Sequence, residues 1–244
     1  MNAYEYVFPV AAGDFVEKSS ENAMKIRQVL GTCFSIGEGF FLTAAHVISS
    51  ALGYEWAGIG FPLEKIWQGS TLINSEILED LDIGIIQAEI PHYKSLMWNT
   101  QTLAMWESAR TVGFPYALDL EHFHLNVRAF AGHVVSEMNF YGLRAKPRIY
   151  ELSFQAPRGL SGAPLLTQKG KMFVSGLVIG NKSTEMQIFS DREIVADGNK
   201  EILVERYEAL QLGIAVSSTA ILELHSKILG STLRDHLAKN GLAG

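Results

Sequence analysis

The sequence lacks several features that would place the chain in a specialised class. It has a single cysteine, Cys33, so no disulfide can form within the chain, which favours a reducing compartment. No apolar run approaches the length of about 18 residues that spans a bilayer. The amino terminus has no basic segment and carries Glu5 and Asp14 where a signal peptide is apolar. We therefore expect a cytoplasmic protein with no membrane partner.

Positive charge is also scarce. The 20 Lys and Arg are outnumbered by 26 Asp and Glu, for a net charge of −6 over 244 residues. Binding to nucleic acid or to anionic lipid needs a broad cationic face, and such a chain does not supply one. We expect no nucleic-acid partner.

The sequence does contain many short apolar segments. With 48% hydrophobic and 19% charged residues, it has ordinary globular composition, which excludes wholesale disorder. The segments are rich in β-branched and aromatic residues and are separated by Gly, Pro, Asn or Asp, which is typical of short strands. We place a first set at 24–36, 40–43, 56–61, 72–78, 83–88 and 109–114. We place a second set at 127–136, 148–154, 163–167, 172–179, 187–190 and 211–216.

The end of the chain has a different pattern. Apolar residues recur at helical spacing after three candidate N-caps at 217–219, which predicts a C-terminal helix. The segment 181–208 is more charged than a hairpin requires, and we expect an exposed loop there. The whole pattern predicts an all-β fold of two six-stranded antiparallel β-barrels, at 1–116 and 117–216, with the C-terminal α-helix in 217–244.

The sharpest local motif is Gly159-Leu160-Ser161-Gly162-Ala163-Pro164. Small residues on both sides of a serine let the backbone turn tightly, which exposes Oγ and directs nearby N–H groups into one space. Acyl transfer needs that arrangement, because negative charge develops on the substrate oxygen as the serine attacks. A glycine-rich hairpin turn explains the same six residues, so this motif alone leaves both interpretations open.

Two further motifs carry a histidine and a carboxylate. Thr43-Ala44-Ala45-His46 delivers a histidine at the end of a strand, and Asp82 directly precedes the apolar run 83–86. A carboxylate so placed can accept from the Nδ1–H of an imidazole and stabilise the imidazolium. Taken separately, the histidine is also typical of a buried core position and the aspartate of a turn.

In the order His, Asp, Ser, these motifs resemble those of the chymotrypsin-like (trypsin-fold) serine peptidases, closest to the bacterial HtrA/Deg-like peptidase domains. The resemblance runs from about Gly31 to Ile179 and implies a single peptidase domain without cofactor or metal. It implies that His46 is the general base, Asp82 the orienting acid and Ser161 the nucleophile. It also implies an oxyanion hole formed by the backbone N–H groups of Gly159 and Ser161. Asp80 is the alternative acid, but only Asp82 is followed directly by the buried strand.

The resemblance also implies where a substrate side chain binds. The S1 pocket would be lined by Gln155, Ala156, Gly176, Leu177, Val178 and Ile179. Gln155 stands where an aspartate would select Arg or Lys, so we expect a small or medium apolar P1 residue. Leu160 replaces the aspartate that pairs with a cleaved N-terminus in zymogen-activated relatives. Control would then come from the segment 181–208 or from a partner protein.

These observations leave three candidate functions. The first is a serine endopeptidase acting on protein or peptide substrates. The second is a latent peptidase domain that an activating partner or a larger assembly switches on. The third is a catalytically silent peptide-binding module, which is disfavoured because all three catalytic residue types are present. An α/β-hydrolase esterase is excluded, because its order of nucleophile, acid and histidine is different.

Overall fold

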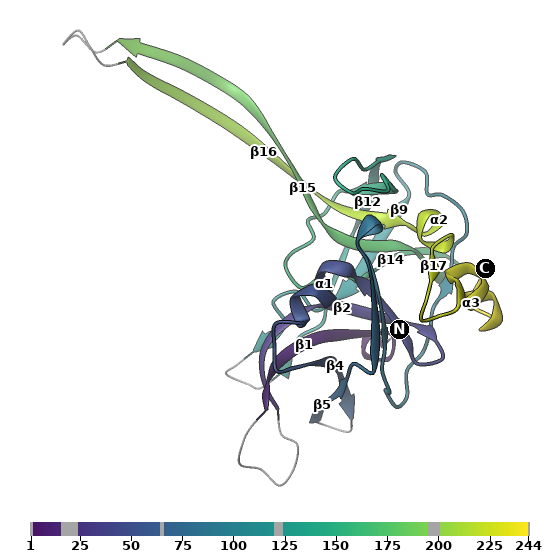
Figure 1. Ribbon diagram of the computed structural model, residues 1–244. Coiled ribbons are helices and arrows are strands. Elements are labelled where there is room, and N and C mark those ends of the chain that lie inside the picture. The colour runs from purple at the N-terminus through teal and green to yellow at the C-terminus, as the bar shows by residue number, and fades with distance from the viewer. Residues whose placement is uncertain (1, 16–23, 64–65, 120–123, 195–200, 244) are drawn as a thin grey trace.

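The computed structural model describes residues 2–15, 24–63, 66–119, 124–194 and 201–243 (Figure 1). Two large antiparallel sheets form the body, and short helices lie at its surface. The prediction of an all-β chain built on two barrel-like sheets is confirmed. Each sheet has seven strands rather than the six expected.

The first sheet carries the candidate histidine and aspartate. Its strands, in spatial order, are β5 (Ile66–Thr71), β4 (Trp56–Leu63), β1 (Val7–Phe15), β2 (Met24–Gly37), β3 (Phe40–Ala44), β7 (Ile83–Gln87) and β6 (Asn74–Leu78). Strands β3 and β7 pair next to the edge strand β6, and most of their apolar side chains are fully buried, as for Leu42 and Ile85. Continuous burial of such β-branched and aliphatic residues stabilises these strands more than any local turn.

The second sheet carries the candidate serine. Its strands, in order, are β14 (Pro164–Lys169), β9 (Ser108–Gly113), β12 (Arg128–Asn139), β13 (Arg148–Leu152), β16 (Glu201–Ser217), β15 (Lys171–Ile194) and β8 (Met97–Trp98). Strand β14 also pairs with β15, so six of these strands close into a ring. Strand β8 lies outside the ring and pairs with β15 in parallel.

Two strand predictions need correction. The segment 109–114 was assigned to the first set, but β9 pairs with β12 and β14 of the second sheet. The change of sheet therefore comes before residue 108 rather than at residue 116. The structure also has the strand β1, which was not expected before residue 24. It pairs on both edges, with β2 and β4, and is buried almost throughout.

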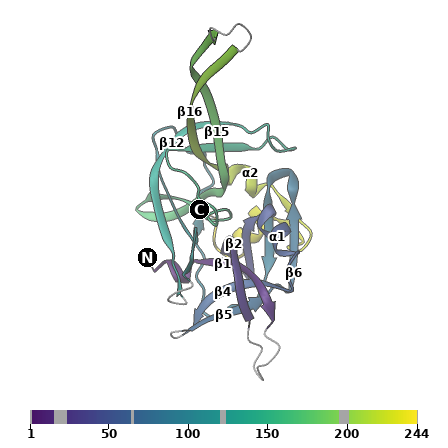
Figure 2. The same cartoon turned by 90° about the vertical axis from the view of Figure 1, so that its left-hand side faces the viewer.

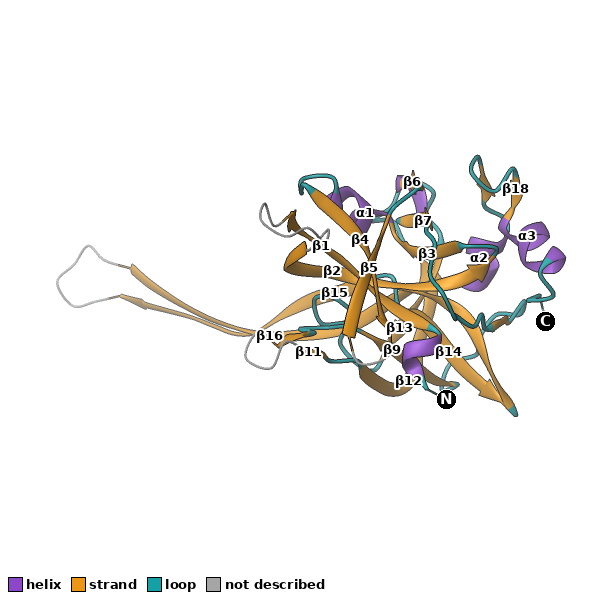
Figure 3. Ribbon diagram, turned by 90° about the horizontal axis from the view of Figure 1, so that it is seen from below, coloured by secondary structure: helices purple, strands orange, loops and turns teal. Residues whose placement is uncertain are grey.

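The expectation of a loop over 181–208 is wrong for the described residues. Strands β15 and β16 continue past the body as a long two-stranded hairpin, which we call the arm (Figure 1; Figure 3). Their pairing runs from Lys182↔Leu212 to Ile194↔Glu201, with a bulge between Gln187 and Phe189. The residues 195–200 lie outside the described part. Figure 2 shows the arm leaving the body on the side of the second sheet.

At the C-terminus, two short helices replace the single helix that was expected. They are α2 (Ser218–Leu222) and α3 (Leu233–Lys239), separated by the hairpin of β17 (His225–Ser226) and β18 (Ser231–Thr232). The Glu76 carboxylate accepts from the backbone N–H groups of Lys227 and Ile228, which holds the chain in a non-helical turn. Each helix buries its own leucines, so the helical spacing of apolar residues is real but interrupted.

The remaining elements are small. They are the 3-10 helices η1 (Ala3–Glu5) and η2 (Glu79–Leu81), the helix α1 (Ala45–Ala51), and the hairpin of β10 (Leu118–Asp119) and β11 (His124–Leu125). None of the helices in the described chain has the length and apolar character needed to cross a bilayer.

Candidate active site

His46 lies in the first turn of α1, directly after strand β3. Ala44 is extended and ends the strand, and Ala45 N donates to Asp82 O at 3.1 Å. Val47 and Ile48 are buried and fix the helix on the sheet, whereas the His46 side chain is half exposed. The short helix therefore presents the imidazole to solvent at the junction of strands β3 and β7.

Asp82 holds the imidazole from the neighbouring strand. It follows η2 with a backbone φ of 53°, in the left-handed region, and leads into β7. His46 Nδ1 lies 2.8 Å from Asp82 Oδ2 and 3.0 Å from Oδ1, and the His46 backbone N–H also donates to Oδ1 at 3.0 Å. Because a carboxylate only accepts, the Nδ1 atom carries the proton and Nε2 of the neutral ring is left as a base.

Asp80, the alternative acid, does not contact His46. It is exposed, and Arg144 lies 3.9 Å from its carboxylate. The geometry pairs Asp82 with the histidine.

Ser161 lies in a tight turn that glycine makes accessible. Gly159 and Gly162 have φ values of 97° and 86°, which only glycine adopts without strain. A Cβ on Gly159 would lie 2.6 Å from Phe114 O, and one on Gly162 would overlap Thr32 O. Leu160 between them is fully buried, so its side chain belongs to the core.

Both sheets hold the turn around Ser161. From β2, Thr32 N donates to Ser161 O at 2.8 Å and Thr32 Oγ1 donates to Gly159 O at 2.9 Å. From β15, Val178 O accepts from Gly162 N at 2.8 Å. A Cβ on Gly162 would also lie 3.0 Å from Ala44 N, two residues before His46. The packing thus brings Ser161 from the second sheet beside the His46 segment of the first.

The Ser161 hydroxyl does not bond to the histidine in this structure. Its one hydrogen bond within the described chain is donated to Ile179 O, at a long 3.4 Å. Catalytic hydrogen bonds in a free enzyme are often long or misaligned and tighten when substrate binds.

Two backbone N–H groups of the turn are without an acceptor in the described part of the chain. Leu160 N donates to Pro157 O and Gly162 N to Val178 O, whereas Gly159 N and Ser161 N donate to no protein atom there. A free N–H on the serine itself and another two residues before it are what a developing oxyanion requires. These are the two groups that the resemblance assigned to an oxyanion hole.

The predicted substrate-binding residues divide into two groups. Leu177 and Val178 are fully buried, and with Gly176 they lie in the part of β15 that pairs with both β14 and β16. Ile179 follows them, and its carbonyl faces the serine hydroxyl.

Gln155 and Ala156, the second group, precede the Ser161 turn in the chain. Ala156 N donates to Asn181 Oδ1 at 2.6 Å, and Asn181 Nδ2 donates to Ala156 O at 2.9 Å. The Asn181 amide therefore ties the 155–156 segment to β15, a contact between segments that the sequence pattern did not indicate.

Thr32 is the other residue that sequence reasoning missed. It is a fully buried hydroxyl in β2, and its Oγ1 also accepts from Phe114 N at 3.0 Å. A buried polar residue needs hydrogen-bond partners, so its position in β2 was a usable signal.

Comparisons with known proteins bear on the fold. No protein-family model and no curated protein sequence matches the chain. Solved structures do match. The Rv3671c protease of M. tuberculosis in its inactive form superposes with a TM-score of 0.56 at 16% identity, covering 98% of this chain and 90% of that one. Its active form gives 0.56 at 15%, covering 89% and 78%. The HtrA-type protease AlgW with a decapeptide gives 0.62 at 13%, covering 98% and 66%. At these identities the likeness establishes the fold.

Proposed function

We propose that this chain, which has the fold of the trypsin-like serine proteases related to HtrA, is a serine endopeptidase. The observation that carries the proposal is the His46 Nδ1–Asp82 contact of 2.8 Å beside a glycine-framed serine with two unpaired N–H groups. Each part is common alone. Together they supply a base, its orienting acid, a nucleophile and an anion site.

In the proposed reaction Ser161 Oγ attacks the scissile carbonyl carbon while His46 Nε2 takes the hydroxyl proton. The carbonyl oxygen becomes an oxyanion and accepts from Gly159 N and Ser161 N. As the C–N bond breaks, the imidazolium gives its proton to the leaving amine, and an acyl-Ser161 ester remains. Water then repeats the sequence with His46 as base, releasing the acid. Asp82 stays ionised throughout and stabilises the imidazolium.

The proposed substrate is a peptide segment in extended form. Beyond Ile179 the free edge of β15 can pair with such a segment, and backbone hydrogen bonds then supply much of the affinity. The AlgW structures with a tripeptide and a decapeptide support a peptide ligand for this fold. The proposed P1 residue is small or medium and apolar, because Gln155 rather than an acidic residue precedes the serine turn and the Asn181 amide is already bonded to Ala156.

A latent peptidase is the second candidate, and one observation favours it. The Ser161 hydroxyl bonds to Ile179 O rather than to His46, so the resting site lacks the contact that activates the nucleophile. The protease Rv3671c has been solved in both active and inactive forms. An activating partner would act by reorienting the serine turn. The single buried cysteine fits work in a reducing, cytoplasmic setting for either candidate.

Labelling with a fluorophosphonate tests the proposal, because this reagent modifies a serine that a base already activates. We expect a single adduct by intact mass on the wild type and none on Ser161→Ala or His46→Ala. Labelling of Ser161→Ala would place the reactive group elsewhere and overturn the assignment. Absence of labelling on the wild type would reject the constitutively active enzyme in favour of the latent one or of a silent module.

A further inference from the structure

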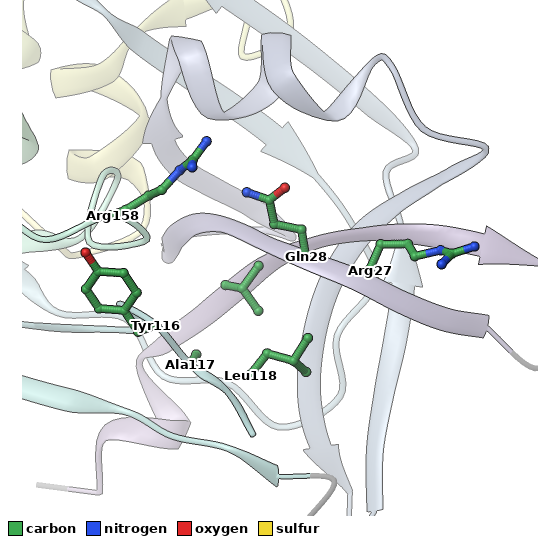
Figure 4. Close-up of a pocket in the computed structure, with 7 residues that line it drawn as sticks. Arg27, Gln28, Tyr116, Ala117, Leu118 and Arg158 are labelled. Carbon is green, nitrogen blue, oxygen red and sulfur yellow. The ribbon is translucent and has the colours of Figure 1, made fainter. Parts of the chain in front are cut away.

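A pocket of about 270 Å³ opens beside the serine turn, on the side of strand β2 (Figure 4). Its lining comes from three segments: residues 27–29 of β2, residues 116–118, and Arg158 immediately before Gly159. Val29, Ala117 and Leu118 give it an apolar wall. The polar lining residues are Arg27, Gln28, Tyr116 and Arg158, and none is acidic. In a chain of net charge −6, such a pocket is a local exception.

Its polar groups are arranged as donors. Arg158 has neither an ion pair nor a side-chain hydrogen bond within the described chain, whereas Arg27 pairs with Asp14 outside the pocket. Gln28 Oε1 accepts from Tyr54 OH at 3.1 Å, which leaves the Gln28 NH₂ group as a donor. In Figure 4 the ends of Arg158 and Gln28 point toward the same space. A free guanidinium next to an amide donor suits a carboxylate.

The pocket wall is fixed before any ligand binds. Arg128 Nη1 donates to Pro115 O at 2.6 Å and to Tyr116 O at 2.9 Å, and Tyr116 N donates to Arg158 O at 3.3 Å. These bonds tie the 115–117 segment to β12 and to the serine turn. A preformed wall reduces the entropy lost on binding.

The position of the pocket assigns it to one half of a substrate. The serine turn lies between β15, which bonds to Gly162 N, and β2, which bonds to Ser161 O. A peptide whose acyl half pairs along β15 from Ile179 crosses the turn at Ser161, so its leaving half continues over β2. Arg158, next to the proposed oxyanion donor Gly159, lines the pocket on this side of the turn.

We propose that this pocket binds an acidic side chain among the first three residues of the leaving half of the substrate. The carboxylate pairs with Arg158 and accepts from Gln28, and its aliphatic stem packs on Val29 and Leu118. The proposal rests on the proposed peptidase function and adds the substrate class, a protein segment with Asp or Glu after the cleaved bond.

Cleavage-site profiling on a proteome-derived peptide mixture tests it. We expect Asp and Glu to be enriched at one position after the cleaved bond. For a matched pair of peptides taken from the best-cleaved sequence, kcat/KM should be about tenfold higher with Glu than with Gln at that position, the size expected for one charge-assisted pair. The ratio is taken within each variant, so it cancels any change in the reactivity of Ser161.

The variants make the test specific. Arg158→Gln should bring the Glu/Gln ratio close to one, and Arg158→Glu should reverse the preference toward Lys. Arg144→Gln, an exposed arginine outside the pocket, should keep the wild-type ratio. A wild-type ratio near one, or a tenfold ratio that survives in Arg158→Gln, would overturn the proposal.

A binding measurement distinguishes failure of the peptidase function from failure of the pocket proposal. If the wild type neither cleaves nor takes the fluorophosphonate, binding is measured by anisotropy instead, with a fixed pair of fluorescein-labelled extended peptides that differ only by Glu or Gln at three consecutive central positions. Tenfold tighter binding of the Glu peptide that disappears in Arg158→Gln would support the pocket without catalysis. Equal binding of both peptides would overturn it.

Discussion

Asp82 has two functions at the level of single residues. Its carboxylate accepts from the His46 ring and from the His46 backbone N–H, so one side chain fixes both the imidazole and the start of α1. Its left-handed backbone turns the chain from η2 into β7, where that carboxylate can reach back to the helix. The backbone conformation of Asp82, as much as its charge, therefore determines that this carboxylate pairs with His46.

Asp82→Asn is the first test at this scale. An amide can donate to Nδ1, which moves the imidazole proton to Nε2 and removes the base. We expect the rate of fluorophosphonate labelling to fall by about 10³–10⁴. Asp80→Asn, the neighbouring exposed aspartate, should label at the wild-type rate. A large loss in Asp80→Asn with little loss in Asp82→Asn would reverse the assignment of the acid.

A substitution of Thr32 is the second test at this scale. Thr32→Val keeps the shape of the side chain but leaves Phe114 N and Gly159 O without their buried partner. Each unpaired group should lower the free energy of unfolding by about 1–3 kcal/mol. Urea unfolding should show this loss of stability, and the labelling rate of Ser161 should fall because the turn is released. Thr32→Ser keeps the hydroxyl and should restore the labelling rate. Equal labelling of all three proteins would mean that the hydroxyl has no part in positioning the turn.

Which site residues the sequence reveals depends on how local their motifs are. His46, Asp82 and Ser161 each stand in a short segment of small or apolar residues whose pattern is visible without the fold. Asn181 and Arg158 carry no such pattern, because their roles come from contacts across segments. The S1 interpretation shows the same limit, since Leu177 and Val178 have the right sequence position but point into the core.

At the scale of elements, the arm is the largest departure from the sequence prediction. Its two strands pair with each other, and the described side chains at 183–190 and 203–210 are exposed on both faces. No buried face imposes an apolar alternation, so the segment looks like a charged loop. Lys182 at its root pairs with Glu151 at 2.7 Å. Burial opposes ionisation of Glu151, but hydrogen bonds from Lys182 and Ser136 outweigh it and lower its pKa.

The pairing register shows that the two faces of the arm differ in their side chains. Directly opposed residues share a face, so Met186 and Phe189 lie with Val204 and Leu210, while Gln187 and Tyr207 lie on the other side with Glu205. The first face therefore carries most of the exposed apolar side chains of the arm. Exposed apolar strands of this kind readily associate with other protein chains.

Replacing residues 184–210 by Asn-Gly, which joins the opposed residues Ser183 and Gln211, tests the independence of the arm. Thermal unfolding should remain one cooperative transition within a few degrees of the wild type, because the removed side chains do not pack on the body. Light scattering at high protein concentration should decrease, since the exposed apolar face is gone. A body that no longer melts cooperatively would mean that the arm supports the second barrel.

Helix α3 provides a pH-dependent element. His236 Nε2 lies 3.1 Å from Ile36 O, and burial lowers its pKa below the ordinary 6.5, although nearby Glu38 opposes this and Lys239 reinforces it. The unfolded chain then binds the proton more strongly, so stability is full above pH 6.5 and is lost as the pH falls below it. Glu38 and Glu76 have lowered carboxyl pKa values, so their protonation affects stability only below about pH 4.5, outside this window.

Urea unfolding between pH 7.5 and 5.5 measures this effect. The wild type should lose stability across the window, and His236→Gln, which can still donate to Ile36 O, should lose less. His225→Gln removes an exposed histidine and should keep the wild-type slope. The same slope in His236→Gln as in the wild type would assign the effect to other groups.

For the whole molecule, Cys33 reports on whether the two sheets unfold together. It is fully buried in β2, and burial raises the pKa of its thiol well above the ordinary value. The native protein should therefore resist iodoacetamide and react only in denaturant. If both sheets unfold as one unit, the midpoint of Cys33 labelling should coincide with that of tryptophan fluorescence, to which the buried Trp98 contributes. Cysteine labelling at lower denaturant would show that the first sheet opens alone.

The Thr32 contacts also set the order in which the site is assembled during synthesis. His46 and Asp82 are 36 residues apart and meet within the first sheet, whereas Thr32 must reach partners 82 and 127 residues further along. The ring that carries Ser161 closes only when β16 pairs between β13 and β15, near the end of the chain. Contacts so distant in sequence form late. In a growing chain, His46 and Asp82 can therefore meet long before the turn of Ser161 is fixed beside them, so the proposed base would precede the proposed nucleophile during synthesis.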